Sequence, residues 1–72
     1  MSLGRFKDKM RERAKKYRER SERLLKEAEM ENAKQRISLY LLGIEASIIA
    51  NMLEEIADII EEVEKDESSS PQ

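Results

Sequence analysis

Cysteine and histidine are absent from this sequence of 72 residues, which also contains one proline, two glycines and three aromatic residues. Without cysteine no disulfide can form, and without cysteine and histidine the usual structural zinc site has no ligands. A catalytic serine would lack its ordinary general base, and there is no thiol nucleophile. We therefore expect no enzymatic activity, no cofactor, no metal site and no small-molecule substrate.

Few turn residues and many charges also limit the fold. The scarcity of glycine and proline excludes a β-sandwich or barrel, so with 42% charged residues we expect an all-α protein. The hydrophobic core of a chain this short rarely supplies more than about 3–5 kcal/mol of stability. Since disulfides and zinc are excluded, regular helix packing and self-association remain as the expected sources of stability.

The composition gives weaker expectations about location and origin. No early segment resembles a targeting signal, because the apolar stretch begins only at Ile37, and we therefore expect a cytoplasmic protein. The excess of Lys, Arg and Glu with many Ile resembles proteins of hyperthermophiles, and equally computationally designed helical bundles. Both resemblances imply thermostability, and composition does not separate them.

Charge is distributed very unevenly along the chain, although its net value is only −2. Residues 5–26 contain eleven Lys and Arg against four Asp and Glu, a net charge of +7, whereas residues 27–72 contain three against twelve, a net charge of −9. Cations in the first turns of a helix are unfavourable, because exposed backbone N–H groups already make that end positive. We expect an acidic helix packed alongside to compensate.

The apolar spacing predicts two helices, over about 5–30 and about 34–65. In the first, small residues recur every seven positions at Ala14, Ser21 and Ala28, which permits a close approach of a second helix. The second has two adjacent apolar stripes, wider together than the roughly 100° that one neighbour covers. We therefore expect the second helix to pack against both the first helix and another copy of the chain.

The region between the helices lacks glycine and proline, so two architectures remain open. Asn32 and Gln35 have the spacing of a helix cap, which favours a turn near residues 31–35. The alternative is one long helix from about Arg5 to Lys65 in an antiparallel coiled coil. Residues 1–67 would form a single domain in either case, and residues 68–72 a disordered tail.

We favour an antiparallel hairpin that pairs with a second copy into a four-helix bundle, with facing positions summing to about 66. The expected core within one chain consists of Phe6, Met10, Tyr17, Leu24, Leu42, Ile49, Leu53, Ile56 and Ile60. The expected interface with the second copy, most simply in a dimer, consists of Leu41, Ile44, Ile48, Met52 and Ile59. Gly43 would allow close packing.

The predicted function is that of a structural or protein-interaction module that binds itself. Glu45 lies between the two apolar stripes, and the predicted register places it near Arg20 or Arg23. An ion pair there would fix the register or the oligomer number. The run 37–53 is too short for a membrane span, and Glu45 and Asn51 interrupt it.

The alternative function is nucleic-acid binding by the basic first helix. The candidate contacts are Arg11, Arg13, Lys15, Lys16, Arg18 and Arg20. The charge layout resembles that of basic-region leucine zippers, but the Asn-x-x-Ala-Ala-x-x-Cys/Ser-Arg core of that family is missing. Glu54, Asp58 and Glu61 share a helix face that slightly resembles the metal-binding motifs of all-α nucleotide pyrophosphohydrolases, and we interpret it as a solvated face.

Overall fold

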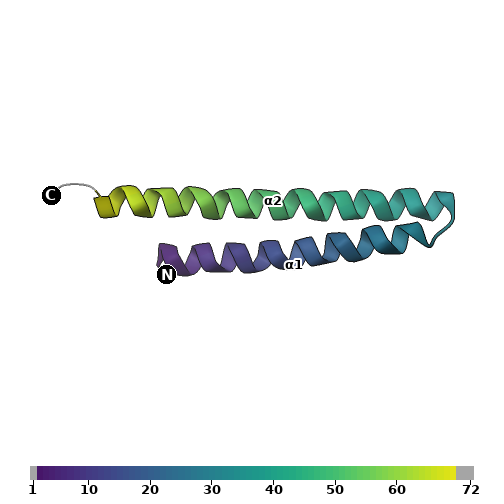
Figure 1. Ribbon diagram of the computed structural model, residues 1–72, viewed down its shortest axis with the longest axis horizontal. Helices are drawn as coiled ribbons and strands as arrows, with labels where there is room; N and C mark the ends of the chain where they lie inside the picture. The colour runs from purple at the N-terminus through teal and green to yellow at the C-terminus, as the bar shows by residue number, and fades with distance from the viewer. Residues whose placement is uncertain (1, 70–72) are drawn as a thin grey trace.

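The computed structural model describes residues 2–69, which form two helices joined by a short turn (Figure 1). Helix α1 spans Leu3–Glu29 and helix α2 spans Ala33–Ser69. They lie side by side in opposite directions, in a hairpin about 62 Å long, and α2 projects beyond the start of α1. The predicted all-α hairpin is confirmed for the described residues, and the alternative of one long helix is wrong.

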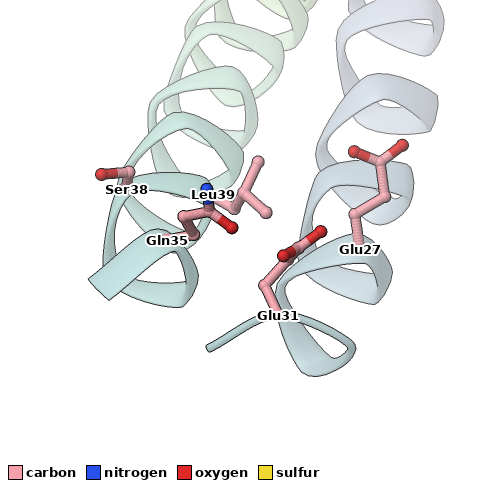
Figure 2. Close-up of a pocket in the computed structure, with 5 residues that line it drawn as sticks. All are labelled: Glu27, Glu31, Gln35, Ser38 and Leu39. Atoms are coloured by element: carbon pink, nitrogen blue, oxygen red, sulfur yellow. The ribbon is translucent and has the colours of Figure 1, made fainter. Parts of the chain in front are cut away.

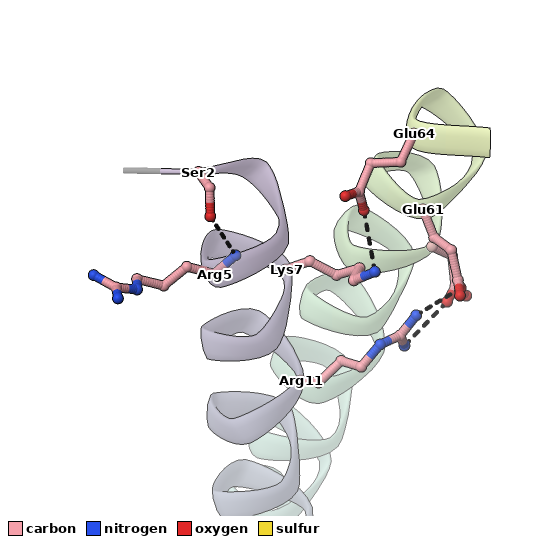
Figure 3. Close-up of polar contacts among 7 residues, drawn as sticks. Ser2, Arg5, Lys7, Arg11, Glu61 and Glu64 are labelled. Atoms are coloured by element: carbon pink, nitrogen blue, oxygen red, sulfur yellow. Dashed lines mark hydrogen bonds and ion pairs between the residues drawn. The ribbon is translucent and has the colours of Figure 1, made fainter. Parts of the chain in front are cut away.

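The boundaries differ from the prediction by a few residues. Both helices begin slightly earlier than expected, because each has a polar cap. Ser2 Oγ accepts a hydrogen bond from the backbone N–H of Arg5 at 3.2 Å (Figure 3), and Asn32 Oδ1 accepts one from the N–H of Gln35 at 3.1 Å. At the other end, residues 68 and 69 of the predicted tail belong to α2, whereas residues 70–72 lie outside the described part.

The turn reverses the chain without a glycine, and no described residue has a positive φ. Helices commonly end on a glycine in the left-handed region, whose backbone geometry satisfies the last carbonyl groups. Here Arg36 does this from the first turn of α2. Its Nε donates to the carbonyl of Ala28 at 3.2 Å, and its Nη2 donates to the carbonyl of Glu31 at 3.1 Å. The backbone N–H groups of Met30 and Glu31 also donate to the carbonyls of Glu27 and Ala28, so the turn and Arg36 together satisfy the end of α1 without a glycine.

A seam of small residues joins the two helices. Its members are buried and are Ala14, Ser21 and Ala28 of α1 with Gly43, Ala46, Ala50 and Ala57 of α2. Ser21 Oγ donates a hydrogen bond of 2.7 Å to the carbonyl of Gly43, so the backbone of α2 lies within reach of a short side chain on α1. Gly43 lies against both Ser21 and Leu25, and these two contacts fall on either side of the expected register. The predicted role of the small residues is confirmed.

The prediction of nine large residues as the core within one chain is wrong. None of them is buried: Phe6, Leu42 and Ile56 are exposed, and the other six are only half-buried. Small residues bring the helix axes so close together that no large side chain fits between them. The large side chains are therefore displaced from the seam to its edge.

The displaced side chains share one side of the hairpin. At about 100° per residue, Tyr17 and Leu24 of α1 lie on the same flank of the seam as Leu53 and Ile60 of α2. The nine displaced residues are hereafter called the apolar side. The opposite flank carries ion pairs between the helices. A single hairpin is therefore a two-helix layer with one apolar side and one charged side.

Replacing Gly43 should test the close approach of the helices. A Cβ at this position would lie 2.9 Å from Leu25 Cδ2 and 3.0 Å from Leu25 Cγ. We expect Gly43→Leu to push the helices apart and to lower the free energy of unfolding by about 1–3 kcal/mol. Chemical denaturation at a fixed chain concentration measures this.

The matched control is Gly4→Leu, because a Cβ at Gly4 meets only Glu64 Oε2, at an ordinary 3.7 Å. We expect this variant to unfold at nearly the same denaturant concentration as the unmodified protein. Equal losses for the two variants would show that the seam at Gly43 has no special need for a small residue.

Candidate interaction surfaces

The charged side ties the two helices together near the start of α1. Lys7 Nζ lies 3.1 Å from Glu64 Oε1, as Figure 3 shows. The guanidinium of Arg11 binds two carboxylates, Asp58 Oδ1 at 3.2 Å and Glu61 Oε2 at 2.9 Å. The cations in the first turns of α1 thus lie against acids of α2. This confirms the expectation that an acidic helix compensates for them.

A third cation continues this side of the hairpin. Arg18 Nη2 lies 2.9 Å from Glu54 Oε2 and also donates a hydrogen bond of 3.0 Å to Asn51 Oδ1. These side chains remain substantially solvent-exposed, so each ion pair contributes only about 0–1 kcal/mol. Their main effect is on orientation, because only an antiparallel arrangement brings the basic half of α1 beside the acidic half of α2.

These pairs divide the candidate nucleic-acid contacts into two groups. Arg11 and Arg18 are held by carboxylates of α2. The side chains of the other four candidates are exposed and make no ion pair or hydrogen bond in the described part of the chain; they are Arg13, Lys15, Lys16 and Arg20. Three of these four line a shallow groove of about 330 Å³ beside Tyr17, and Lys15 does not.

The carboxylates considered for metal binding already have partners. Glu54, Asp58 and Glu61 face arginines of α1, which neutralise the charge a cation would need. No group of three or more His, Cys, Asp or Glu in the described residues is placed to hold a metal ion. The acidic face of α2 therefore serves packing against α1.

The structure does not bring Glu45 together with Arg20 or Arg23. All three are exposed, and none of them takes part in an ion pair within the described residues. The ion pair expected from the sequence is therefore not formed within the described hairpin.

The predicted interface residues form an exposed apolar surface on α2. Its members are each 50% or more exposed and are Leu41, Ile44, Ile48, Met52 and Ile59. This surface, hereafter the outer face, points away from α1 and continues through Leu42 and Ile56 into the apolar side. Contiguous exposed apolar surface is typical of protein–protein or membrane interaction sites.

A second groove, also of about 330 Å³, lies at the turn. Figure 2 shows that Glu27 and Glu31 come from the end of α1 and the turn, whereas Gln35, Ser38 and Leu39 come from the first turns of α2. Two carboxylates and an amide in an open groove do not make a metal site. The groove lies where the end of α1 and the start of α2 diverge at the turn.

The length and composition of α2 are also compatible with a membrane helix. Its segment Ala33–Glu67 is apolar and long enough to cross a bilayer, a test that the core helix of a soluble protein also passes. A spanning α2 would carry Glu45 and Asn51 into the lipid. It would also have to leave Asp58 and Glu61 without the guanidinium of Arg11.

The ion pairs can be tested by reversing one charge. We expect Arg18→Glu to lower the free energy of unfolding by about 1 kcal/mol, because it replaces an attraction to Glu54 by a repulsion. Adding Glu54→Arg should restore most of the lost stability. High salt should make the loss caused by Arg18→Glu smaller. Thermal denaturation at low and high salt measures both effects.

The control is Arg13→Glu, which changes the net charge equally at a position without an acidic partner in the described structure. We expect a change of no more than about 0.5 kcal/mol. A loss as large as that of Arg18→Glu would mean that overall charge, and not the specific ion pair, matters.

Comparison with known proteins adds no further constraint to this geometry. The chain has no significant match among protein-family models, curated proteins or solved structures.

Proposed function

We propose that this protein is a non-enzymatic helical module that associates with itself through the outer face of α2. The observation that carries the proposal is the pattern of burial. Within the described residues only small side chains are buried, and no large side chain is fully enclosed. Each large aliphatic side chain of the outer face would contribute about 1.5–3 kcal/mol on burial. One hairpin alone leaves this stabilisation unused.

A second copy of the chain fits the outer face, because each outer-face residue on either side of Ile48, except Leu41 whose counterpart is Glu55, has an apolar counterpart equally far from Ile48. Ile37 and Ile59 lie equally far from Ile48 in the two directions, and so do Ile44 and Met52. Two α2 helices crossing antiparallel at Ile48 would set Ile37 level with the partner's Ile59 and Ile44 level with the partner's Met52. Such a two-fold contact is self-complementary.

The charges of α2 favour the same arrangement. Lys34 and Glu62 are exposed and also lie equally far from Ile48, so each would come level with the oppositely charged residue of the partner. A parallel pair would instead set Glu62 beside Glu62 and Lys34 beside Lys34. Two hairpins joined in this way would bring four helices into one assembly, as expected from the sequence, but with the two α2 helices in the middle and one α1 helix at each outer edge.

The first test is the mass of the protein in dilute solution without detergent. We expect a dimer or a larger even-numbered assembly, and we expect Ile48→Asp to reduce the mass at least by half, because it places a charge at the centre of the contact. Light scattering measures the mass, and circular dichroism checks that the helices remain. A monomeric unmodified protein would contradict the proposal.

A surface aspartate provides the control. Ser38→Asp lies on α2 but outside the outer face, at an exposed position, and should leave the mass unchanged. If both aspartate variants dissociate the assembly, general repulsion explains the result and the outer face is not the contact.

The two-fold geometry can be tested separately, because the chain has no cysteine of its own. We expect Ile48→Cys to form a disulfide-linked dimer on oxidation, since a residue on the axis faces its own copy. Leu41→Cys should not, because the two copies of residue 41 would lie about 20 Å apart along the helices, too far for a disulfide. Electrophoresis without reductant distinguishes them.

Mixed cysteine variants complete this test. Ile37→Cys and Ile59→Cys should each remain unlinked alone but should link when mixed. Efficient linking of Leu41→Cys would indicate a parallel or shifted contact and would exclude the crossing at Ile48.

A further inference from the structure

Six cations form a straight row along α1. They follow one another at spacings of three or four residues, which keeps them on one face of a helix, and they are Arg5, Lys9, Arg13, Lys16, Arg20 and Arg23. All six are exposed, and helix geometry places the row on α1 between its apolar side and the face that points away from α2. This row is hereafter called the basic ridge.

The ridge is distinct from the cations that hold the hairpin together. Lys7, Arg11 and Arg18 bind acids of α2, whereas no ridge side chain makes an ion pair or a hydrogen bond in the part of the chain that the structure describes. Hairpin formation therefore uses three cations and leaves a separate row of six unneutralised.

The acids of α1 do not interrupt this row. Asp8, Glu12, Glu19 and Glu22 lie together on another part of the helix surface. Glu12 and Glu19 precede Lys16 and Arg23 by four residues, but neither ion pair is formed. A helix laced with ion pairs for stability alone would mix the two signs on one face. Segregation of this kind instead creates a strip of positive potential.

The middle of the ridge is shaped to receive an anion. Arg13, Lys16 and Arg20 line the shallow groove of about 330 Å³ together with Tyr17 of the apolar side. Three positive side chains around one concave site suit a phosphate group, which accepts several charge-assisted hydrogen bonds at once.

We propose that the basic ridge binds the phosphate backbone of duplex nucleic acid. The ridge extends over about 27 Å, at 1.5 Å per residue, and a duplex presents a phosphate on each strand every 3.4 Å or so. An elongated polyanion can therefore meet all six cations together, whereas a small anion reaches two or three. The contacts are to the backbone and carry no base specificity.

A flat lipid surface fits the geometry less well. The ridge borders the apolar side, so a bilayer could contact these two together, but it could not also reach the outer face on the far edge of α2. For the same reason, self-association through the outer face leaves the ridge open. The binding site therefore does not depend on the proposed dimer, although a dimer would carry two ridges on opposite edges.

The structure also revises the set of contact residues expected from the sequence. Arg11 and Arg18 are engaged with α2, and Lys15 lies off the ridge. Arg5, Lys9 and Arg23 replace them, because they continue the row at both ends. Arg13, Lys16 and Arg20 remain from the original set.

The test compares two double variants of the full chain that differ only in position. Lys9→Gln with Lys16→Gln removes two ridge charges, and Lys15→Gln with Lys26→Gln removes two exposed charges elsewhere on α1. Fluorescence anisotropy of a labelled duplex DNA of 20 base pairs, titrated at several salt concentrations, gives the affinity and its salt dependence. Circular dichroism and light scattering confirm that helix content and mass are unchanged.

We expect the unmodified protein to bind at low salt. The ridge variant should bind at least about tenfold more weakly, with a salt slope smaller by about 2, since each phosphate contact contributes about 0.9 to the slope. The off-ridge variant should lose no more than about twofold. Equal losses of affinity for both variants would show that binding depends only on overall charge. This result would overturn the assignment of the binding site to the basic ridge.

Two other outcomes would also overturn it. One is the absence of duplex binding by the unmodified protein at low salt. The other is binding to vesicles containing an anionic lipid, such as phosphatidylserine, without binding to the duplex, which would assign the ridge to a membrane surface. Because mass is measured in the same samples, a failure of self-association would be seen separately from a failure of DNA binding.

Discussion

The close approach of α1 and α2 along the small-residue seam is the constraint on which the rest of the structure depends. The hydrogen bond of 2.7 Å from Ser21 to the carbonyl of Gly43 requires that a short side chain of one helix reach the backbone of the other. Alanine and glycine allow this approach but bury little apolar area. The seam therefore determines how the helices pair while supplying only a modest part of the stability that a folded protein needs.

Charge determines the direction of pairing. The cations that act between the helices lie in the first two thirds of α1, at Lys7, Arg11 and Arg18, and their partners lie between Glu54 and Glu64 of α2. A parallel arrangement of the helices would separate these groups by most of the length of the molecule. Exposed ion pairs contribute little individually, but together they distinguish one orientation from the other.

Most of the secondary structure was predictable from the sequence, and the core was not. Periodicity located both helices, and the spacing of Asn32 and Gln35 located the second cap, because these are local properties of the chain. A helical pattern shows which residues share a face, but not how closely that face will approach another. The seven-residue repeat of Gly43, Ala50 and Ala57 was the available signal for a close seam in α2.

Other features depend on contacts that no local pattern encodes. The capping of the first helix by Arg36 joins residues eight positions apart across the turn, so it becomes visible only once the hairpin is formed. The ion pairs of Arg11 and Arg18 are a similar case, since the sequence alone does not show which cations the second helix will neutralise. The even spacing of the ridge itself was visible, but only the structure separates it from Arg11 and Arg18.

The seam also explains how a chain with a net charge of −2 can present a strongly positive surface. A close seam forces the side chains around it outward, so each helix has distinct sides. The acids that face α1 are neutralised by Lys7, Arg11 and Arg18, and the large apolar residues of α2 turn away from α1. Six of the remaining cations then form one row on α1, between its apolar side and the face that points away from α2. The net charge is the sum over these sides and does not describe any one of them. The electrostatic potential of this molecule therefore has to be considered separately for each side.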